Sequence, residues 1–272
     1  MYQSNFPNDK EMTYPRICAH RGFSKIAPEN SLPAFGAAVA LGAEEIEFDL
    51  RATKDDVIIS LHDPSLERIS DGIGAEVDHT YEELLQYDFG FKFNEAFRGL
   101  KIITFEDILK KFARQVIMNI HIQIRDVNDE HLKTIISLIE KYDCKDYCYF
   151  MVSEEETLSK LQVLAPDIAR CAGEEWDKHP DYLLEKAIRT GCTKIQLFTP
   201  LFERYINEFR QDYLEDMVSK AHANGITCNL CIANEPELAE YYLSKGVDTL
   251  LTDDFLKIAI CCENFRKNRG AE

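Results

Sequence analysis

The sequence lacks any long uninterrupted apolar run. No stretch approaches the roughly 18 consecutive apolar residues that a membrane-spanning helix requires. The opening MYQSNFPNDKEMTYPR also has no apolar segment of the kind that a secretory signal peptide carries. We therefore expect a cytoplasmic protein without stable membrane association.

Basic residues are scarce relative to acidic ones. The chain has 31 Lys and Arg against 48 Asp and Glu, which gives a formal net charge of −17. Nucleic acids and anionic membrane surfaces attract proteins with clustered basic residues, so neither is expected as a partner. An anionic small molecule remains compatible with this charge, because a bound metal ion can make a pocket locally positive.

The cysteines lack the pairing that marks a zinc or redox site. Cys228 and Cys231 form a C-x-x-C pair, but no second pair follows, and both lie in one apolar run. The nine cysteines are therefore expected to be reduced and to pack as small apolar side chains.

A glycine-rich phosphate loop after the first strand is also absent, which argues against a doubly wound open sheet. Instead, short apolar runs alternate with amphipathic segments along the whole chain. Eight strands, each followed by a helix, are expected to end near His20, Asp49, Gln123, Ser153, Gly173, Phe198, Ala233 and Asp253. Eight such units predict an α/β fold, a (β/α)8 TIM barrel that forms a single domain over residues 1–272.

One further strand-like run, VIISLHD at residues 57–63, does not fit the repeat. The segment of residues 51–56 that precedes it is too short for a parallel crossover. We expect a hairpin-like arm over the mouth of the barrel, continued by an irregular stretch. Together they would form a small insertion after the second strand, at about residues 57–100.

Two carboxylates share one face of the second strand. In EIEFDL, the strand period of two places Glu47 and Asp49 on one side and Ile46, Phe48 and Leu50 on the other. TIM-barrel active sites form at the C-terminal ends of the strands, where this pair lies. Two inward carboxylates repel each other unless a cation lies between them, and oxygen ligands suit Mg²⁺ or Ca²⁺.

The run NIHIQIR repeats this alternation and places Asn119, His121, Gln123 and Arg125 on one face. Polar side chains that face into a barrel are costly unless they hydrogen-bond or serve a ligand. Either they form a satisfied hydrogen-bonded layer, or they belong to a site. The two carboxylates and the histidine on neighbouring strands favour the second interpretation.

Histidine occurs at two positions suited to proton transfer. The first strand ends in His20, Arg21 and Gly22, which brings a proton carrier and a fixed positive charge together. His62 in the arm can face His20 across the pocket, and two such histidines can act as general acid and general base. The remaining histidines, expected at the surface or in packing, are His79, His131, His179 and His222.

Four stretches together resemble the glycerophosphodiester phosphodiesterase family: AHRG, APENSLPAF, GAEEIEFDLRATKDDVIISLHDPSLERISDG and GVDTLLTDDF. The resemblance is dense over residues 17–72 and thinner but collinear to residue 253. Members of this family are metal-dependent (β/α)8 barrels of lipid metabolism that hydrolyse glycerophosphodiesters to an alcohol and glycerol 3-phosphate. The resemblance therefore implies a phosphoric diester hydrolase.

The resemblance also implies roles for individual residues. His20 and His62 would form the acid/base pair, and Arg21 would grip the phosphate. The implied substrate-binding residues are Arg21, Glu29, Asn30, Gln123 and Arg125, with Glu29 and Asn30 at the edge of the pocket. The implied metal ligands are Glu47, Asp49 and His121.

The sequence departs from the family pattern at His121 and Gln123, where a glutamate ligand and a lysine usually stand. A histidine ligand favours Mn²⁺, Co²⁺ or Zn²⁺ over the Mg²⁺ or Ca²⁺ that the resemblance implies. Arg125 can replace the lysine if its reach suffices. Leu230 and Cys231 lie where the family often has a tryptophan that closes on the glycerol, so the head-group preference stays open.

The sequence thus predicts metal-dependent hydrolysis of small glycerophosphodiesters by a pair of histidines. It leaves open which histidine is the acid, and whether a cyclic phosphate intermediate forms. Two alternatives remain. One is a barrel that binds a phosphate ligand but has lost turnover, and the other is a phosphodiesterase for lysophospholipid-like substrates.

Overall fold

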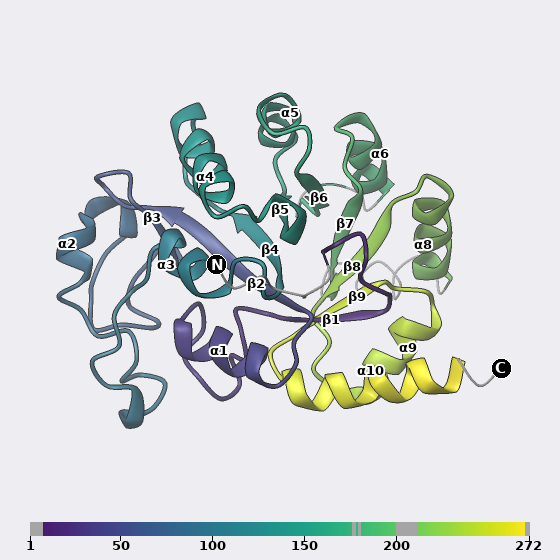
Figure 1. Cartoon of the computed structure of the whole chain (residues 1–272), viewed down its shortest axis with the longest axis horizontal. Coiled ribbons are helices and arrows are strands. Elements are labelled where there is room, and N and C mark those ends of the chain that lie inside the picture. Colours follow the sequence, from purple (N-terminus) through teal and green to yellow (C-terminus); the bar gives the residue numbers. More distant parts are fainter. Residues whose placement is uncertain (1–7, 176–177, 179–180, 200–211, 270–272) are drawn as a thin grey trace.

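The computed structural model describes residues 8–175, 178, 181–199 and 212–269. Its strands are β1 (Arg16–Ala19), β2 (Glu45–Ala52), β3 (Ile58–Ser60), β4 (Ile117–Ile122), β5 (Cys148–Val152), β6 (Ala169–Gly173), β7 (Lys194–Phe198), β8 (Thr227–Cys231) and β9 (Thr249–Thr252). They follow the order β1-β9-β8-β7-β6-β5-β4-β2-β3, and β1 also pairs with β2. All strands except β3 are parallel and close into an eight-stranded barrel (Figure 1). The predicted TIM barrel is confirmed.

Helices cover the outside of the barrel (Figure 1). They are α1 (Leu32–Ala40), α3 (Phe105–Phe112), α4 (Asp129–Lys141), α5 (Glu155–Leu164), α6 (Asp181–Arg189), α8 (Tyr213–Ala223), α9 (Pro236–Ser244) and α10 (Phe255–Arg269). The short helix α2 (Tyr81–Leu84) lies in the insertion. Single 3-10 turns occupy Glu76–Asp78, Glu95–Phe97 and Lys145–Tyr147. The main core lies between helices and strands, and it includes the outward residues Ile46, Phe48 and Leu50 of β2. The inward face of β2 is thereby left for polar residues.

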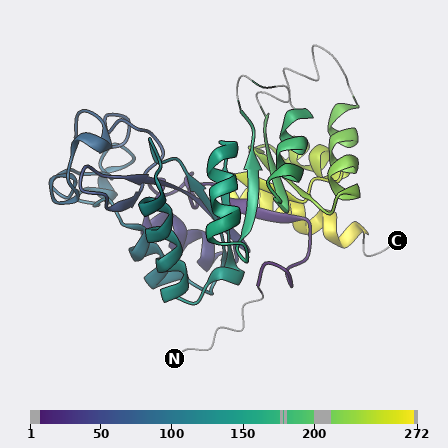
Figure 2. The same cartoon turned by 90° about the horizontal axis from the view of Figure 1, so that it is seen from above.

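The strand β3 forms the expected hairpin with β2. The two strands run antiparallel, with Leu50 opposite Ser60 and Ala52 opposite Ile58. The irregular segment that follows has a small core of its own, made of Ile59, Leu61, Leu66, Leu84, Phe89 and Ile102. This segment projects to one side of the barrel in both cartoon views (Figures 1 and 2). The arm carries His62 back to the strand ends, where the site forms.

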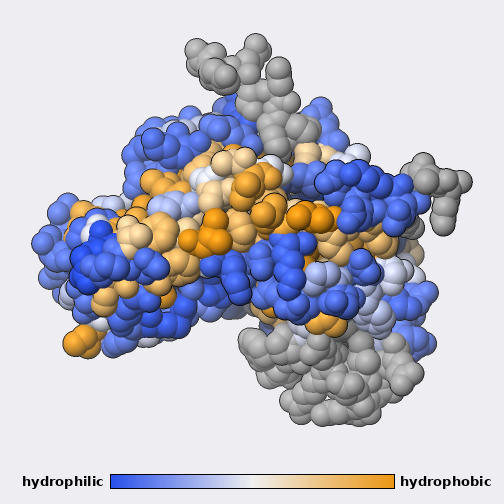
Figure 3. Space-filling view, turned by 90° about the horizontal axis from the view of Figure 1, so that it is seen from below, coloured by the Kyte–Doolittle hydropathy of each residue, from blue (hydrophilic) through white to orange (hydrophobic). Residues whose placement is uncertain are grey.

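The side of the molecule that carries α1 and α10 has much apolar surface (Figure 3). The helix α1 contains no charged residue. Exposed apolar side chains there include Leu41, Leu256 and Ile260, which are 47%, 45% and 54% exposed. Within the part of the chain that the structure describes, no helix combines the length and apolar character that crossing a bilayer requires.

All nine cysteines are free and buried, as expected for reduced cysteines that pack as apolar side chains. Three of the remaining histidines have hydrogen-bond partners outside the catalytic pocket. His79 contacts the carbonyl oxygen of Ala75, His131 contacts Asp56, and His222 contacts Asp248. The fourth, His179, lies outside the described residues.

Candidate active site

A pocket of about 810 Å³ lies at the C-terminal ends of the barrel strands. The predicted residues that line it are His20, Arg21, Glu47, Asp49, His62, His121, Gln123 and Arg125. They come from β1, β2, the arm and the end of β4. The fold thus gathers most of the predicted set in one place, although 105 residues separate the first from the last.

The AHRG turn is shaped by close packing. Arg21 has a φ of 56° and Gly22 a φ of 82°, both in the left-handed region that glycine adopts most easily. A Cβ atom on Gly22 would lie 2.7 Å from backbone and side-chain atoms of Ala34 in α1. The glycine therefore lets α1 approach the strand end. The same turn directs the backbone N–H of Arg21 to Glu47 Oε2, at 3.0 Å.

Glu47, Asp49 and His121 form a candidate metal site. One ligand atom from each lies within 4.8 Å of the other two. The Nδ1 atom of His121 lies 3.0 Å from Asp49 Oδ1 and 3.9 Å from Glu47 Oε1. Two carboxylates and an imidazole are a donor set that divalent cations accept, so these residues fit a metal ion.

The two carboxylates are buried and affect each other's protonation. Burial and repulsion from Asp49 raise the pKa of Glu47 well above its usual range. Burial also opposes ionisation of Asp49, but hydrogen bonding and charge from His121 hold its pKa far below normal. When no cation is present, these shifts favour a protonated Glu47 beside an ionised Asp49. A bound cation would favour the ionised form of both.

Asp49 is held in place by amide side chains. Asn30 donates to Asp49 Oδ2 at 2.9 Å and accepts from the backbone N–H of Asp49 at 3.2 Å. Gln123 Nε2 donates to Asp49 Oδ1 at 3.0 Å. The carboxamide of Asn30 also accepts from Ser60 in the arm, at 3.1 Å. Asn30 thus positions the carboxylate of Asp49, and it is not among the residues that line this pocket.

Each predicted catalytic histidine is paired with an aspartate. The Nδ1 atom of His20 lies 2.8 Å from Asp253 Oδ1, and that of His62 lies 2.6 Å from Asp63 Oδ1. The hydrogen bonds that these aspartates make lower the pKa of each to about 2, despite burial. In both rings Nε2 is then the nitrogen available to a ligand. Burial also lowers the pKa of His62, with Asp49 opposing the shift.

The sequence reasoning did not assign these two aspartates. Asp63 directly follows His62, so its adjacency was a usable signal. Asp253 directly follows β9. It lies beside β1 because β1 and β9 pair where the barrel closes. Ser24 and Asn234 also donate to Asp253, at 3.1 and 2.9 Å, which fixes the aspartate that orients His20.

A chain of ion pairs connects Arg21 with His62. Arg21 Nη1 donates to Glu29 Oε1 at 3.0 Å, and Arg68 donates to both oxygens of Glu29 at 2.7 Å. Arg68 Nε also donates to Asp63, the partner of His62. This network joins the predicted phosphate-binding arginine to a predicted catalytic histidine. Arg68 had no assigned role in the sequence interpretation.

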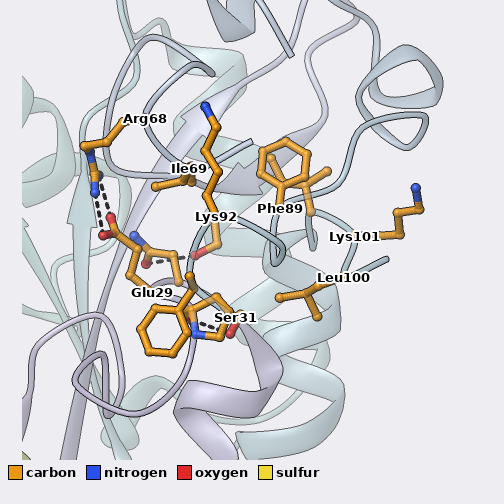
Figure 4. A pocket seen from close by; sticks show the side chains of 13 residues that line it. Glu29, Ser31, Arg68, Ile69, Phe89, Lys92, Leu100 and Lys101 are labelled. Atoms are coloured by element: carbon orange, nitrogen blue, oxygen red, sulfur yellow. Dashed lines mark hydrogen bonds and ion pairs between the residues drawn. The ribbon is translucent and has the colours of Figure 1, made fainter. Parts of the chain in front are cut away.

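Glu29 faces a neighbouring pocket and not the catalytic one. This second pocket lies between the turn that precedes α1 and the insertion, and Glu29, Arg68, Ile69 and Phe89 are among its lining residues (Figure 4). Both oxygens of Glu29 are held by Arg68, whose side chain forms part of the wall. Glu29 thus lines the neighbouring pocket and contacts the catalytic one through Arg21, and its role in substrate binding stays a prediction.

The strand β4 ends earlier than expected, although His121, Gln123 and Arg125 all line the pocket. The strand stops at Ile122, and the carbonyl oxygen of Gln123 accepts from Arg51 Nη1 at 3.1 Å. Arg51 Nη2 also donates to Gln123 Oε1 at 2.9 Å, which directs the amide NH2 group to Asp49 and His121. Arg125 lies beyond the strand as an exposed residue at the rim of the pocket.

Known proteins match this chain over most of its length. The model of the glycerophosphoryl diester phosphodiesterase family matches residues 20–257. The putative glycerophosphodiester phosphodiesterase YhdW of Bacillus subtilis is 40% identical over 242 residues, covering 88% of this chain and 96% of that protein. A glycerophosphodiester phosphodiesterase of Caldanaerobacter subterraneus is 27% identical over 241 residues, covering 88% and 93%.

Solved structures share the fold. The phosphodiesterase of Oleispira antarctica, in complex with the product sn-glycerol-3-phosphate, superposes with a TM-score of 0.81 at 22% identity. The match covers 92% of this chain and 97% of that one. On the sequence matches, the chain belongs to the glycerophosphoryl diester phosphodiesterase family of phosphoric diester hydrolases.

Proposed function

We propose that this enzyme hydrolyses small glycerophosphodiesters to an alcohol and glycerol 3-phosphate, with a divalent metal ion held by Glu47, Asp49 and His121. His20 and His62 would transfer the protons. The observation that carries the proposal is the shared pocket, which brings this ligand set together with two histidine–aspartate pairs. A single domain over residues 1–272 and a cytoplasmic location stay predictions.

The phosphate group would bind between Arg21 and the ligand set. The Nε atom of Arg21 is buried and has no hydrogen-bond partner among the described residues. It lies 3.6 Å from Asp49 Oδ2, beside the ligand set. An N–H group in this position can donate to a phosphoryl oxygen. When bound, the metal ion would act as a Lewis acid that stabilises negative charge on the phosphoryl oxygens.

The two histidines would complete the reaction. One neutral imidazole Nε2 takes a proton from the attacking water, or from a hydroxyl group of the substrate, as the new phosphorus–oxygen bond forms. The other, protonated at Nε2, gives its proton to the leaving alcohol oxygen as the old bond breaks. Asp253 and Asp63 hold Nδ1 of each ring and fix the orientation of both.

The remaining predicted residues would divide between two roles. We infer that Arg21 and Arg125 contact the phosphodiester. Gln123, Glu29 and Asn30 would instead act as positioning residues, because their amide and carboxylate groups are engaged with Asp49, Arg21 and Arg68. Gln123 therefore does not replace the positive charge of the family's lysine.

The test uses purified protein stripped with EDTA, with glycerophosphoethanolamine as substrate and glycerol 3-phosphate as the measured product. We expect no turnover after stripping, and recovery when Mg²⁺, Ca²⁺, Mn²⁺, Co²⁺ or Zn²⁺ is titrated back. Calorimetry on the same preparation should show one cation site that is lost in Glu47→Gln. Full activity of the stripped, metal-free protein would contradict metal dependence. Cation and substrate binding without turnover would favour the ligand-binding alternative.

A further inference from the structure

A buried carboxyl group lines the part of the pocket that β6 and β7 form. Glu174 directly follows β6 and is 5% exposed. Its Oε2 atom accepts from the backbone N–H of Phe198, the last residue of β7, at 2.6 Å. Its Oε1 atom is buried and has no hydrogen-bond partner among the described residues. An unpartnered buried oxygen is unfavourable unless a ligand supplies a partner.

The nearby ammonium group of Lys186 does not fill this role. Its Nζ atom donates to the carbonyl oxygens of Ser153 and Gly173 and to Glu175 Oε1. An ammonium group has three N–H donors, and these three acceptors engage all of them. Lys186 thus binds two backbone carbonyl oxygens and the side chain of Glu175. It leaves Glu174 Oε1 without a hydrogen bond.

The protonation of Glu174 differs from that of an ordinary glutamate. Burial raises its pKa to about 7, and the N–H of Phe198 and the charge of Lys186 oppose the shift. Near neutral pH the carboxyl group is therefore present both as an acid that donates and as a carboxylate that accepts. Either form can make a hydrogen bond to a polar group in the pocket.

We propose that Glu174 forms a subsite that binds a hydroxyl or ammonium group in the organic part of the diester. This inference rests on the proposed function, because it adds a specificity contact to the same pocket. A substrate hydroxyl can donate to the carboxylate or accept from the acid, and an ammonium group can donate to the carboxylate. An apolar group at this position would leave the buried Oε1 atom unpaired, so the subsite rejects it.

The experiment compares three diesters of glycerol 3-phosphate that differ in one terminal group. Their alcohols are ethanolamine, ethylene glycol and n-propanol, which end in ammonium, hydroxyl and methyl groups on chains of equal length. A second series keeps ethanolamine and replaces glycerol with propane-1,2-diol, which removes a hydroxyl at the other end. The kcat/KM ratios are measured for the wild type, Glu174→Gln and Glu174→Leu.

In one of the two series, we expect the wild type to have a higher kcat/KM for the substrate with the polar terminal group than for the one that ends in methyl. The difference should be about tenfold or more, the effect of one good hydrogen bond. Glu174→Leu should abolish this preference. Glu174→Gln keeps an oxygen for the N–H of Phe198 and should retain hydroxyl selectivity while losing ammonium selectivity. The series that responds identifies which end of the diester reaches Glu174.

The control is Glu45→Gln, which changes a fully buried carboxyl group at the opposite end of the barrel. It should leave every substrate ratio unchanged. Equal proportional losses for all esters in the Glu174 variants, or unchanged ratios, would overturn the subsite. Failure of the wild type to hydrolyse any ester would instead overturn the proposed function.

Discussion

At the N-terminal ends of the strands, two acidic and two basic side chains pair with each other. Arg16 lies 2.6 Å from Asp9 and 3.6 Å from Glu45, and Lys194 lies 3.3 Å from Asp9. Tyr149 donates its hydroxyl group to Glu45. Both carboxylates at this end therefore lie beside cations, although burial still raises the pKa of Glu45 and its Oε2 atom accepts no hydrogen bond from the described residues.

At the C-terminal ends the charges are not matched. The guanidinium group of Arg21 lies 3.6 Å from Asp49 and is also paired with Glu29, while Glu47 accepts from the backbone N–H of Arg21. Burial and repulsion from Asp49 raise the pKa of Glu47, whereas hydrogen bonding and charge from His121 hold the pKa of Asp49 low despite its burial. Both ends bury ionisable groups, but only the end with excess negative charge is suited to a cation. An imbalance of charge, more than burial itself, distinguishes the site.

The largest expected contrast is between matched substitutions at the two ends. Glu47→Gln should lower kcat by more than roughly 10³-fold, since a metal ligand supports several kcal/mol of transition-state stabilisation. Glu45→Gln should leave kcat within about twofold but cost about 3 kcal/mol of unfolding free energy, because it breaks a buried ion pair. Steady-state kinetics with saturating metal and urea unfolding measure the two effects. Equal activity loss in both variants would remove the distinction between the ends.

The next effect concerns the histidines at the mouth. His20→Ala and His62→Ala should each lower kcat by roughly 10²-fold or more, the usual contribution of a positioned acid or base. The double variant should lose less than the product of the two losses, because groups that act as a unit are not additive. His222→Ala is the matched control, since His222 also contacts a carboxylate, Asp248 at 2.7 Å, but outside the pocket. Mild, independent losses would indicate histidines that only pack.

The sequence could predict those features of the site that depend on local pattern. Strand alternation placed Glu47 and Asp49 on one face, and the short link before the arm indicated the hairpin that carries His62. It could not predict that Arg68 binds Glu29, because that contact joins positions 39 residues apart. Nor could it predict the end of β4, where a side chain of β2 takes the carbonyl oxygen of Gln123. Glu174 was likewise unassigned, since its burial depends on the neighbouring strand.

A smaller effect should follow from the departure at His121. A neutral ligand gives the site one negative charge fewer than a glutamate would, which weakens its hold on Mg²⁺ and Ca²⁺. His121→Glu should tighten binding of these two ions by about tenfold, since ligand charge sets affinity at such sites. Calorimetric titration of the stripped proteins at pH 7.5 or above, where imidazole is neutral, measures this directly. Unchanged affinities for every cation would mean that His121 is not a ligand.

The smallest predicted effect concerns Glu174, a third kind of buried carboxyl group, whose Oε1 atom has no hydrogen-bond partner among the described residues. Burial raises its pKa from the ordinary 4.5 to about 7, so ionisation disfavours the folded state. Its contribution to stability is complete below the unfolded pKa and is lost as pH rises through 7. Between pH 6 and 7 the loss should be about 1 kcal/mol. Glu174→Gln cannot ionise and should lack this slope.

Urea unfolding of the wild type and Glu174→Gln at half-unit pH steps would measure this pH dependence of the unfolding free energy. Subtracting one curve of free energy against pH from the other cancels the titration of the histidines. The variant should gain stability relative to the wild type as pH rises through this interval. Parallel curves would mean that Glu174 is already paired or solvated in the folded protein. The carboxyl group of Glu174 would then have a partner, as the carboxylates at the N-terminal end of the barrel do.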